Sequence, residues 1–131
     1  MPLNRNLLVG NWEFVETEKY DGSKWIQADH VENMTWEFNP QYFGVTKVIG
    51  NITEQTPSES PTTLNYIFNI FTRQLIIEVH TDPKTKILNE VDIYEVVDVT
   101  ESSDQITVTL SLTNQLDCPT PYLRYKLCKT L

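Results

Sequence analysis

Apolar and polar side chains alternate one by one along most of this chain, and this period of two constrains the fold more than any other feature. The clearest case is ITVTLSL, in which Ile106, Val108, Leu110 and Leu112 are separated by threonine and serine. Successive side chains of a β-strand point to opposite faces, so the alternation predicts strands that bury one face. No stretch of useful length repeats its apolar residues at helical spacing, and an all-β fold is therefore expected.

Clusters of Gly, Pro, Asn and Ser-Asp interrupt the alternation at short intervals and divide the chain into eight predicted strands. Their approximate ranges are 12–20, 33–38, 43–53, 63–71, 75–80, 88–99, 106–112 and 122–129. A short extra piece near Trp25 is left open. Asn39-Pro40 is expected to end the second strand, and a change of parity at Val96-Val97 predicts a bulge in the sixth. Eight successive strands favour an up-and-down meander that closes into a barrel, because closure removes exposed edges.

Length, composition and charge narrow the possible classes of protein. The 131 residues contain no long linker and no internal repeat, which predicts a single domain over 1–131. No apolar run approaches the roughly 20 residues of a membrane-spanning helix, so no transmembrane segment is expected. A net charge of -8 repels phosphate backbones and argues against nucleic acid as a partner. The first ten residues lack the apolar core of a signal peptide, which suggests a cytoplasmic protein or a processed form of an exported one.

The two ends of the chain carry the most specific pattern. Gly10-Asn11-Trp12 opens the first predicted strand, and Trp12 and Phe14 share one face. In a closed barrel the first and last strands are neighbours, so Arg124 on the last strand is expected near Trp12. A guanidinium over an indole face contributes about 0.5 to 2 kcal/mol. Gly10, Trp12 and Arg124 are therefore predicted to form the floor of the barrel.

These residues, together with MTWEF and IYEVVDVTESSDQITVTL in the middle of the chain, resemble the lipocalin-like (calycin) β-barrels, in particular small bacterial members. The resemblance implies an eight-stranded antiparallel up-and-down barrel without the long helix of typical secreted lipocalins. It also implies a non-catalytic carrier of a small hydrophobic or amphipathic ligand. Fatty-acid-binding proteins also begin with Gly-x-Trp, but residues 21–33 are too few for their two-helix lid.

Five aromatic residues in the middle of predicted strands are the candidate ligand-binding residues. They are Trp36, Phe38, Tyr66, Phe68 and Tyr94. In a ligand-binding barrel they would line an apolar cavity in which the tyrosine hydroxyls orient the ligand. In a solid barrel they would simply fill the core. The second alternative predicts a protein-interaction or inhibitor module that acts through its loops, with residues 54–62 as the first candidate.

The sequence shows no catalytic constellation, so neither an enzyme nor a cofactor is expected. It has no Gly-x-Ser-x-Gly motif, no cysteine beside a plausible base and no glycine-rich phosphate loop. His30 and His80 lack a third ligand at diagnostic spacing, and Cys118 and Cys128 cannot build a zinc site alone. A disulfide between these cysteines would require a chain reversal, and no metal site is predicted. Lys47 interrupts an apolar alternation, either as an inward partner for an anionic group or as an outward residue.

Overall fold

The computed structural model describes residues 3–28, 33–81, 88–113 and 123–130, with the side chains at 79–81 and 88–90 excepted. Nine antiparallel strands form one sheet in the order β2-β1-β3-β4-β5-β6-β7-β8-β9. Their bounds are β1 Gly10–Tyr20, β2 Trp25–Gln27, β3 Thr35–Phe43, β4 Lys47–Gln55, β5 Thr62–Asn69, β6 Gln74–Thr81, β7 Leu88–Glu101, β8 Gln105–Leu112 and β9 Leu123–Thr130. This part of the chain contains no helix long and apolar enough to cross a membrane.

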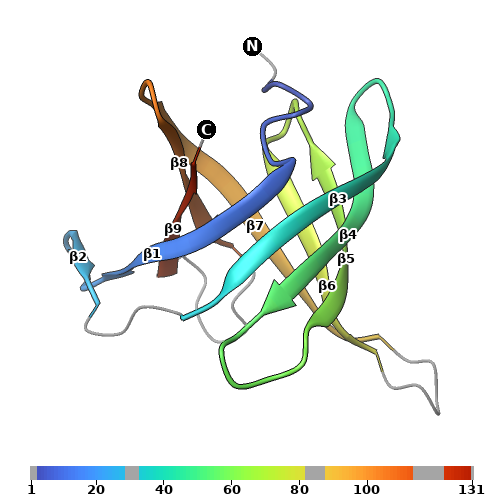
Figure 1. Ribbon diagram of the computed structural model, residues 1–131. Helices are drawn as coiled ribbons and strands as arrows, with labels where there is room; N and C mark the ends of the chain where they lie inside the picture. The colour runs from blue at the N-terminus through green and yellow to red at the C-terminus, as the bar shows by residue number, and fades with distance from the viewer. Residues whose placement is uncertain (1–2, 29–32, 82–87, 114–122, 131) are drawn as a thin grey trace.

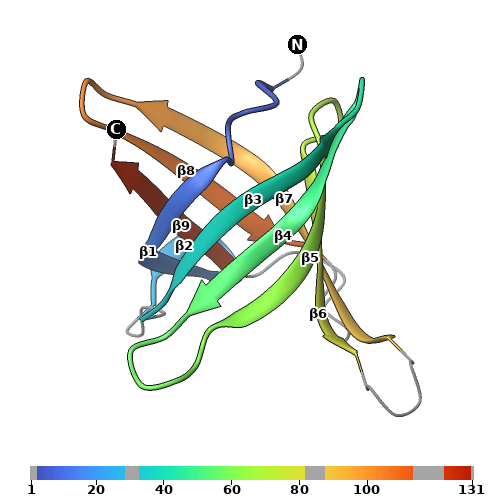
Figure 2. The ribbon, with the colours of Figure 1, turned by 45° about the vertical axis from the view of Figure 1, so that its right-hand side comes forward.

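Pairing between the first and last strands closes the sheet into a barrel (Figures 1 and 2). β1 pairs with β9 from Glu13↔Cys128 to Lys19↔Leu123, while its other edge pairs first with β3 and then with the short β2. The predicted eight-stranded antiparallel barrel is therefore confirmed, with β2 as the additional strand near Trp25 that the sequence left open.

The bulge predicted in the sixth strand is confirmed, because the β7–β8 register shifts between Val96 and Asp98. The expected stop at Asn39-Pro40 is wrong, since β3 continues to Phe43 with a register shift after Pro40. β1 leaves the edge of β3 at Phe38, so Pro40 lies where β3 has lost that neighbour. A residue without an N–H is tolerated at such an edge or bulge.

The structure shows which side chains of β4 point into the barrel, a question that the sequence left open. Val48 and Ile52 are buried inside the barrel, whereas Lys47 and Ile49 lie on the outer face. The hypothesis of an inward Lys47 is therefore wrong. Gly50 also faces inward, and a Cβ added there would meet the Pro40 Cα at 2.8 Å and the Asn39 carbonyl. The close approach of β3 to β4 thus requires glycine at this position.

The segment before β1 packs across one end of the barrel, which we call the plug end (Figure 1). Leu8 is buried and Leu3 packs against the core, with its N–H donating to the Ile70 carbonyl at 2.9 Å. The Trp12 indole N–H donates to the Leu8 carbonyl at 2.9 Å. The last described residue, Thr130, belongs to the part of β9 that pairs with the start of β8, so both ends of the chain reach the plug end.

The floor of the barrel contains Trp12 as predicted, but its cationic partner is Lys129 and not Arg124. Lys129 Nζ lies 5.1 Å from the Trp12 ring centroid and donates to the Val9 carbonyl at 2.8 Å. The guanidinium of Arg124 instead lies 4.0 Å from the centroid of Trp25. The reason is register, because Arg124 pairs with Glu18, far along β1 from Trp12. Gly10 adopts a φ of 112°, which an L side chain rarely adopts.

Candidate functional site

The five aromatic residues singled out in the sequence are all buried and belong to one core cluster. They are Trp36, Phe38, Tyr66, Phe68 and Tyr94. Four of them form a chain of edge-to-face contacts, with ring centroids 5.0 Å apart for Phe38 and Tyr66, 6.0 Å for Trp36 and Phe38, and 6.1 Å for Trp36 and Tyr94. No ring contact joins Phe68 to this chain among the described residues. These rings therefore pack against one another as core side chains.

The chain of rings continues toward the end of the barrel opposite the plug, which we call the loop end because residues 56–61 connect β4 and β5 there. Phe14 lies 4.8 Å from Trp36 and 5.8 Å from Tyr125, whose ring lies 6.3 Å from Tyr94. Phe14, Trp36, Tyr94 and Tyr125 form what we call the aromatic cluster. Tyr125 was not among the site residues predicted from the sequence, although alternation along β9 puts it on the same face as the buried Leu127.

Two carboxylates reach this cluster from inward positions. Glu54 pairs with Trp36 across β3 and β4, and the indole N–H donates to Glu54 Oε2 at 2.8 Å. Asp92 accepts a long hydrogen bond of 3.5 Å from the Tyr94 hydroxyl. Burial first, and then the neighbouring Asp92, Tyr125 and Glu54, raise the pKa of Tyr94 far above its ordinary value. The phenol of Tyr94 therefore stays protonated and lies within electrostatic range of both carboxylates.

A buried hydroxyl lies beside the aromatic cluster. Thr17 pairs with Tyr125, so the two side chains share the inner face of the barrel. Its side chain is only 6% exposed, and Oγ1 has no hydrogen-bond partner within the described part of the chain. A buried hydroxyl without a partner costs about 1–3 kcal/mol. Thr17 thus leaves polar hydrogen-bonding capacity next to the cluster that the fold itself does not use.

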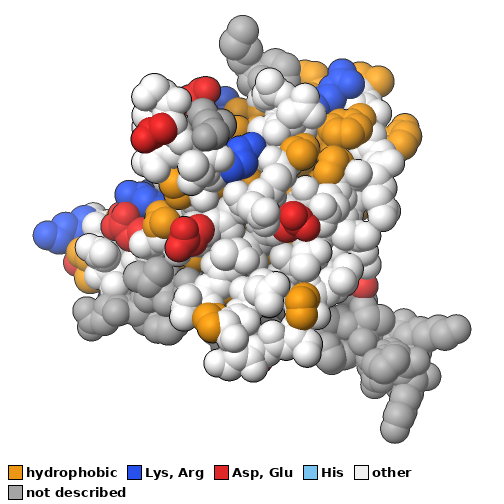
Figure 3. Space-filling view, viewed as in Figure 1, with side chains coloured by type: hydrophobic (Ala, Val, Ile, Leu, Met, Phe, Trp, Pro, Cys, Tyr) orange, Lys and Arg blue, Asp and Glu red, His pale blue; other side chains and the backbone are white. Residues whose placement is uncertain are grey.

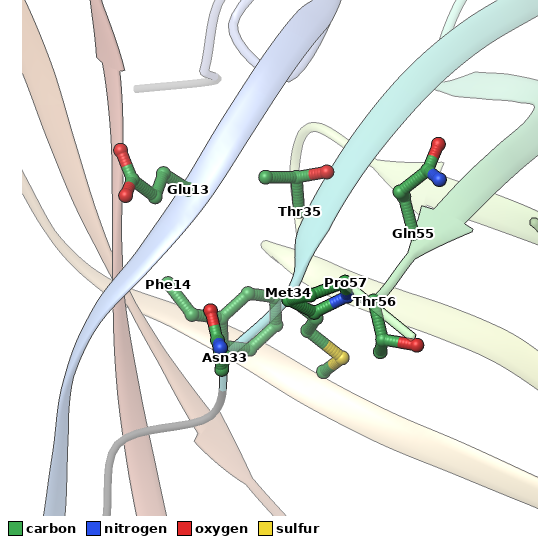
Figure 4. Close-up of a pocket in the computed structure, with 8 residues that line it drawn as sticks. All are labelled: Glu13, Phe14, Asn33, Met34, Thr35, Gln55, Thr56 and Pro57. Atoms are coloured by element: carbon green, nitrogen blue, oxygen red, sulfur yellow. The ribbon is translucent and has the colours of Figure 1, made fainter. Parts of the chain in front are cut away.

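The point at which β3 leaves β1 opens a pocket of about 170 Å³ beside the aromatic cluster (Figure 4). The ladder between these strands runs only from Gly10 to Glu13 on β1. Phe14 and Met34 line the pocket from the inner side, while Glu13 and Thr35 belong to the outer face. Phe14 belongs both to this pocket and to the aromatic cluster, so the pocket borders the cluster there. Glu54 does not line the pocket itself but precedes Gln55, which does.

Because it contains buried tyrosines, the barrel is predicted to lose stability at alkaline pH. Burial raises the pKa of Tyr66 from 10.0 to about 12, so the folded state holds this proton more tightly than the unfolded state does. The resulting stabilisation is complete below pH 10 and is lost as the pH rises from 10 to 12. We expect the urea midpoint of the wild-type protein to fall across this interval. Tyr66→Phe should show a shallower fall, and an equally steep fall in this variant would contradict the assignment.

The remaining candidate residues do not gather into a site within the described part of the chain. His30 and Cys118 lie outside the described residues, as does the side chain of His80. Cys128 is a free cysteine, and its thiol lies 3.2 Å from Gln105 Oε1. Among the described residues no group of three or more His, Cys, Asp and Glu side chains is arranged to hold a metal ion.

No family model matches the chain, and no curated protein matches it in sequence. The features of the molecule that bear on its function are therefore the closed barrel, the aromatic cluster and the polar groups around that cluster.

Proposed function

We propose that this barrel is a non-catalytic, lipocalin-like binder of a small amphipathic molecule that carries a basic nitrogen. The apolar part of the ligand contacts the aromatic cluster at the loop end, and its protonated nitrogen pairs with Glu54. The observation that carries the proposal is the half-buried carboxylate of Glu54 on the inner face of β4, where the other inward residues carry no polar side chain. The closed barrel and its Trp12 floor support the lipocalin-like assignment.

The acceptor positions that the protein leaves unfilled on Glu54 indicate that the ligand carries a positive charge. An ionised carboxylate has about four acceptor positions, and the described residues fill one of them with the Trp36 indole N–H. No described Lys, Arg or His lies within ion-pair distance of Glu54. Withdrawing a carboxylate from water is costly unless an opposite charge or several donors compensate it. An ammonium group supplies both, and aromatic rings around it add cation–π attraction.

The size of the pocket limits the size of the ligand. A volume of about 170 Å³ is close to the engineered cavity of about 150 Å³ that holds one benzene molecule. The ligand that fits is therefore a compact amine built on one ring or a short branched chain, rather than a long acyl chain. Because no described nucleophile is paired with a base in the cluster, the proposed role is binding and not conversion.

Three probes with the same phenyl group test the proposal: 2-phenylethylamine, 2-phenylethanol and 3-phenylpropionate. We expect the amine to bind about tenfold or more tightly than the alcohol, because it gains the charge interaction with Glu54. The carboxylate should bind most weakly, because it meets like charge. Quenching of tryptophan fluorescence follows binding beside Trp36, and calorimetry gives the affinities.

Glu54→Gln keeps an acceptor for the Trp36 indole N–H and removes the charge. In this variant the amine and the alcohol should bind equally, whereas Glu101→Gln, which changes an exposed glutamate on β7, should retain the preference. Thr17→Val tests the second polar group and should weaken the binding of the amine without loosening the fold. If none of the probes binds, the binding proposal is wrong, and the alternative of a solid barrel acting through residues 54–62 stands.

A further inference from the structure

An apolar row crosses the outer face of the barrel over four neighbouring strands. The registers Ile49↔Ile67, Ile67↔Ile76 and Ile76↔Ile93 place one isoleucine from each of β4, β5, β6 and β7 side by side. We call these four residues the isoleucine row. Ile49 and Ile67 are 39% and 37% exposed, although the barrel has a complete interior core in which such side chains are normally placed.

The surroundings of the row enlarge this apolar surface. Tyr42 extends the row onto β3 by pairing with Ile49, and it is 60% exposed. Phe43 and Val45 are exposed beside it, and hydrophobic side chains gather over the plug ends of β3 and β4 (Figure 3). The outer face is also hollowed along the row, where a depression of about 370 Å³ lies against Ile49, Ile67 and Ile76. Contiguous exposed apolar surface of this kind is typical of an interaction site.

The polar row on the plug side of the isoleucine row shows which partner fits. On the plug side the register Lys47↔Asn69↔Gln74↔Glu95 puts a cation on β4, two amides on β5 and β6, and an anion on β7. The row therefore has opposite charges at its two ends and amides between them. Rotation by half a turn about an axis between β5 and β6 superposes the cation position on the anion position.

We propose that a second copy of this chain packs on the isoleucine row, related by a two-fold axis that runs parallel to the strands between β5 and β6. This symmetry places β4 of one copy against β7 of the other, so that Lys47 faces the partner's Glu95 at both edges. Ile67 then faces the partner's Ile76, and the amides of Asn69 and Gln74 face each other. A two-fold interface requires such self-complementary surfaces.

The partner is identified by the arrangement of charge rather than by apolar area alone. A net charge of -8 makes two copies repel each other, so random association through an apolar patch is opposed. Lys47 and Glu95 are both exposed on the outer face, at the edges of the proposed contact. Complementary charges at the rim of an interface select the partner and fix its register.

The test exchanges the two charges separately and then mixes the products. In Lys47→Glu homodimers both edges place glutamate against glutamate, and in Glu95→Lys homodimers both edges place lysine against lysine. We expect each variant alone to dimerise about tenfold or more weakly than the wild-type protein in sedimentation velocity, because two attractive contacts become repulsive. An equimolar mixture of the two variants restores both attractive contacts and should recover wild-type dimerisation as a heterodimer.

Matched variants separate this contact from general charge effects. Lys24→Glu and Glu13→Lys make the same changes at exposed positions away from the row and should not alter dimerisation. Ile67→Asp should weaken the dimer about a hundredfold, because it puts a charge at the centre of the contact. Ile67→Thr keeps a β-branched strand residue and should have a smaller effect in the same direction. The proposal would be overturned if the wild-type protein stayed monomeric to millimolar concentration. It would also be overturned if the mixture of Lys47→Glu and Glu95→Lys dimerised no better than each variant alone.

Discussion

Replacing Gly50 with alanine is expected to lower the free energy of unfolding by about 3 kcal/mol or more, the largest effect of any single change considered for this protein. The added Cβ would lie 2.8 Å from the Pro40 Cα and against the Asn39 carbonyl. These are backbone atoms of β3, so no rotation of a side chain can relieve the clash. The backbones of β3 and β4 must separate, which disturbs the ladder that holds Trp36 opposite Glu54. Equilibrium urea denaturation of both proteins measures the difference.

Gly22→Ala is the matched control for Gly50→Ala. Gly22 has a φ of 104° in the exposed turn between β1 and β2, and a Cβ there would meet no atom within 4 Å. The cost should therefore come only from the backbone conformation and amount to about 1 kcal/mol. If the two substitutions destabilise the barrel equally, the close approach of β3 and β4 is not what makes Gly50 necessary.

Replacing Lys129 with methionine is expected to lower the free energy of unfolding by about 2 kcal/mol. The ammonium group donates to the carbonyls of Val9 and Leu7, at 2.8 Å and 3.4 Å, and lies over the Trp12 ring. Hydrogen bonds from a charged donor contribute about 1.5–3 kcal/mol. Burial lowers the pKa of Lys129, which means that desolvation of the ammonium offsets part of this gain. Methionine keeps most of the side-chain volume, so the change isolates the polar contacts.

Arg124→Met provides the comparison for Lys129→Met in the same strand. The guanidinium stacks on Trp25 at 4.0 Å, and Trp25 lies in the short β2 outside the barrel wall. A cation over an indole at a partly exposed site contributes about 0.5–1 kcal/mol, so the loss should be smaller than at Lys129. Thermal denaturation of the two variants shows which substitution destabilises the protein more. A larger loss at Arg124 would mean that β2, rather than the segment before β1, does more to hold β1 and β9 together.

The architecture follows from alternation because a period of two leaves little freedom once eight strands are recognised. The inward rows of β3 and β5 could be predicted residue by residue, and Trp36, Phe38, Tyr66 and Phe68 are all buried. Register between distant strands could not be predicted in this way. Of Arg124 and Lys129 on the last strand, Lys129 shares the inner face with Tyr125 and Leu127, and the pairing of Phe14 with Leu127 brings it beside Trp12.

The candidate site was only partly predictable for a related reason. Trp36 and Tyr94 stand out in the sequence because aromatic residues within strands are conspicuous. Glu54 and Thr17 do not, because a carboxylate or a hydroxyl at a strand position normally faces water. A bulge between Phe14 and Glu16 shifts the facing of β1, so Thr17 turns inward where strict alternation from Trp12 would turn it outward. Local pattern therefore located the apolar wall of the site, while its polar groups depend on the bulge and on strand pairing.

The position of both ends of the chain at the plug end has a practical consequence for any assay of this barrel. Leu3 and Thr130 lie at the plug end, whereas the pocket beside Phe14 and the residues 56–61 belong to the loop end. A tag, a fluorescent domain or a surface tether attached at either terminus would hold the molecule by its plugged side. The candidate site would then face the solution, so immobilised protein presents the same pocket as free protein.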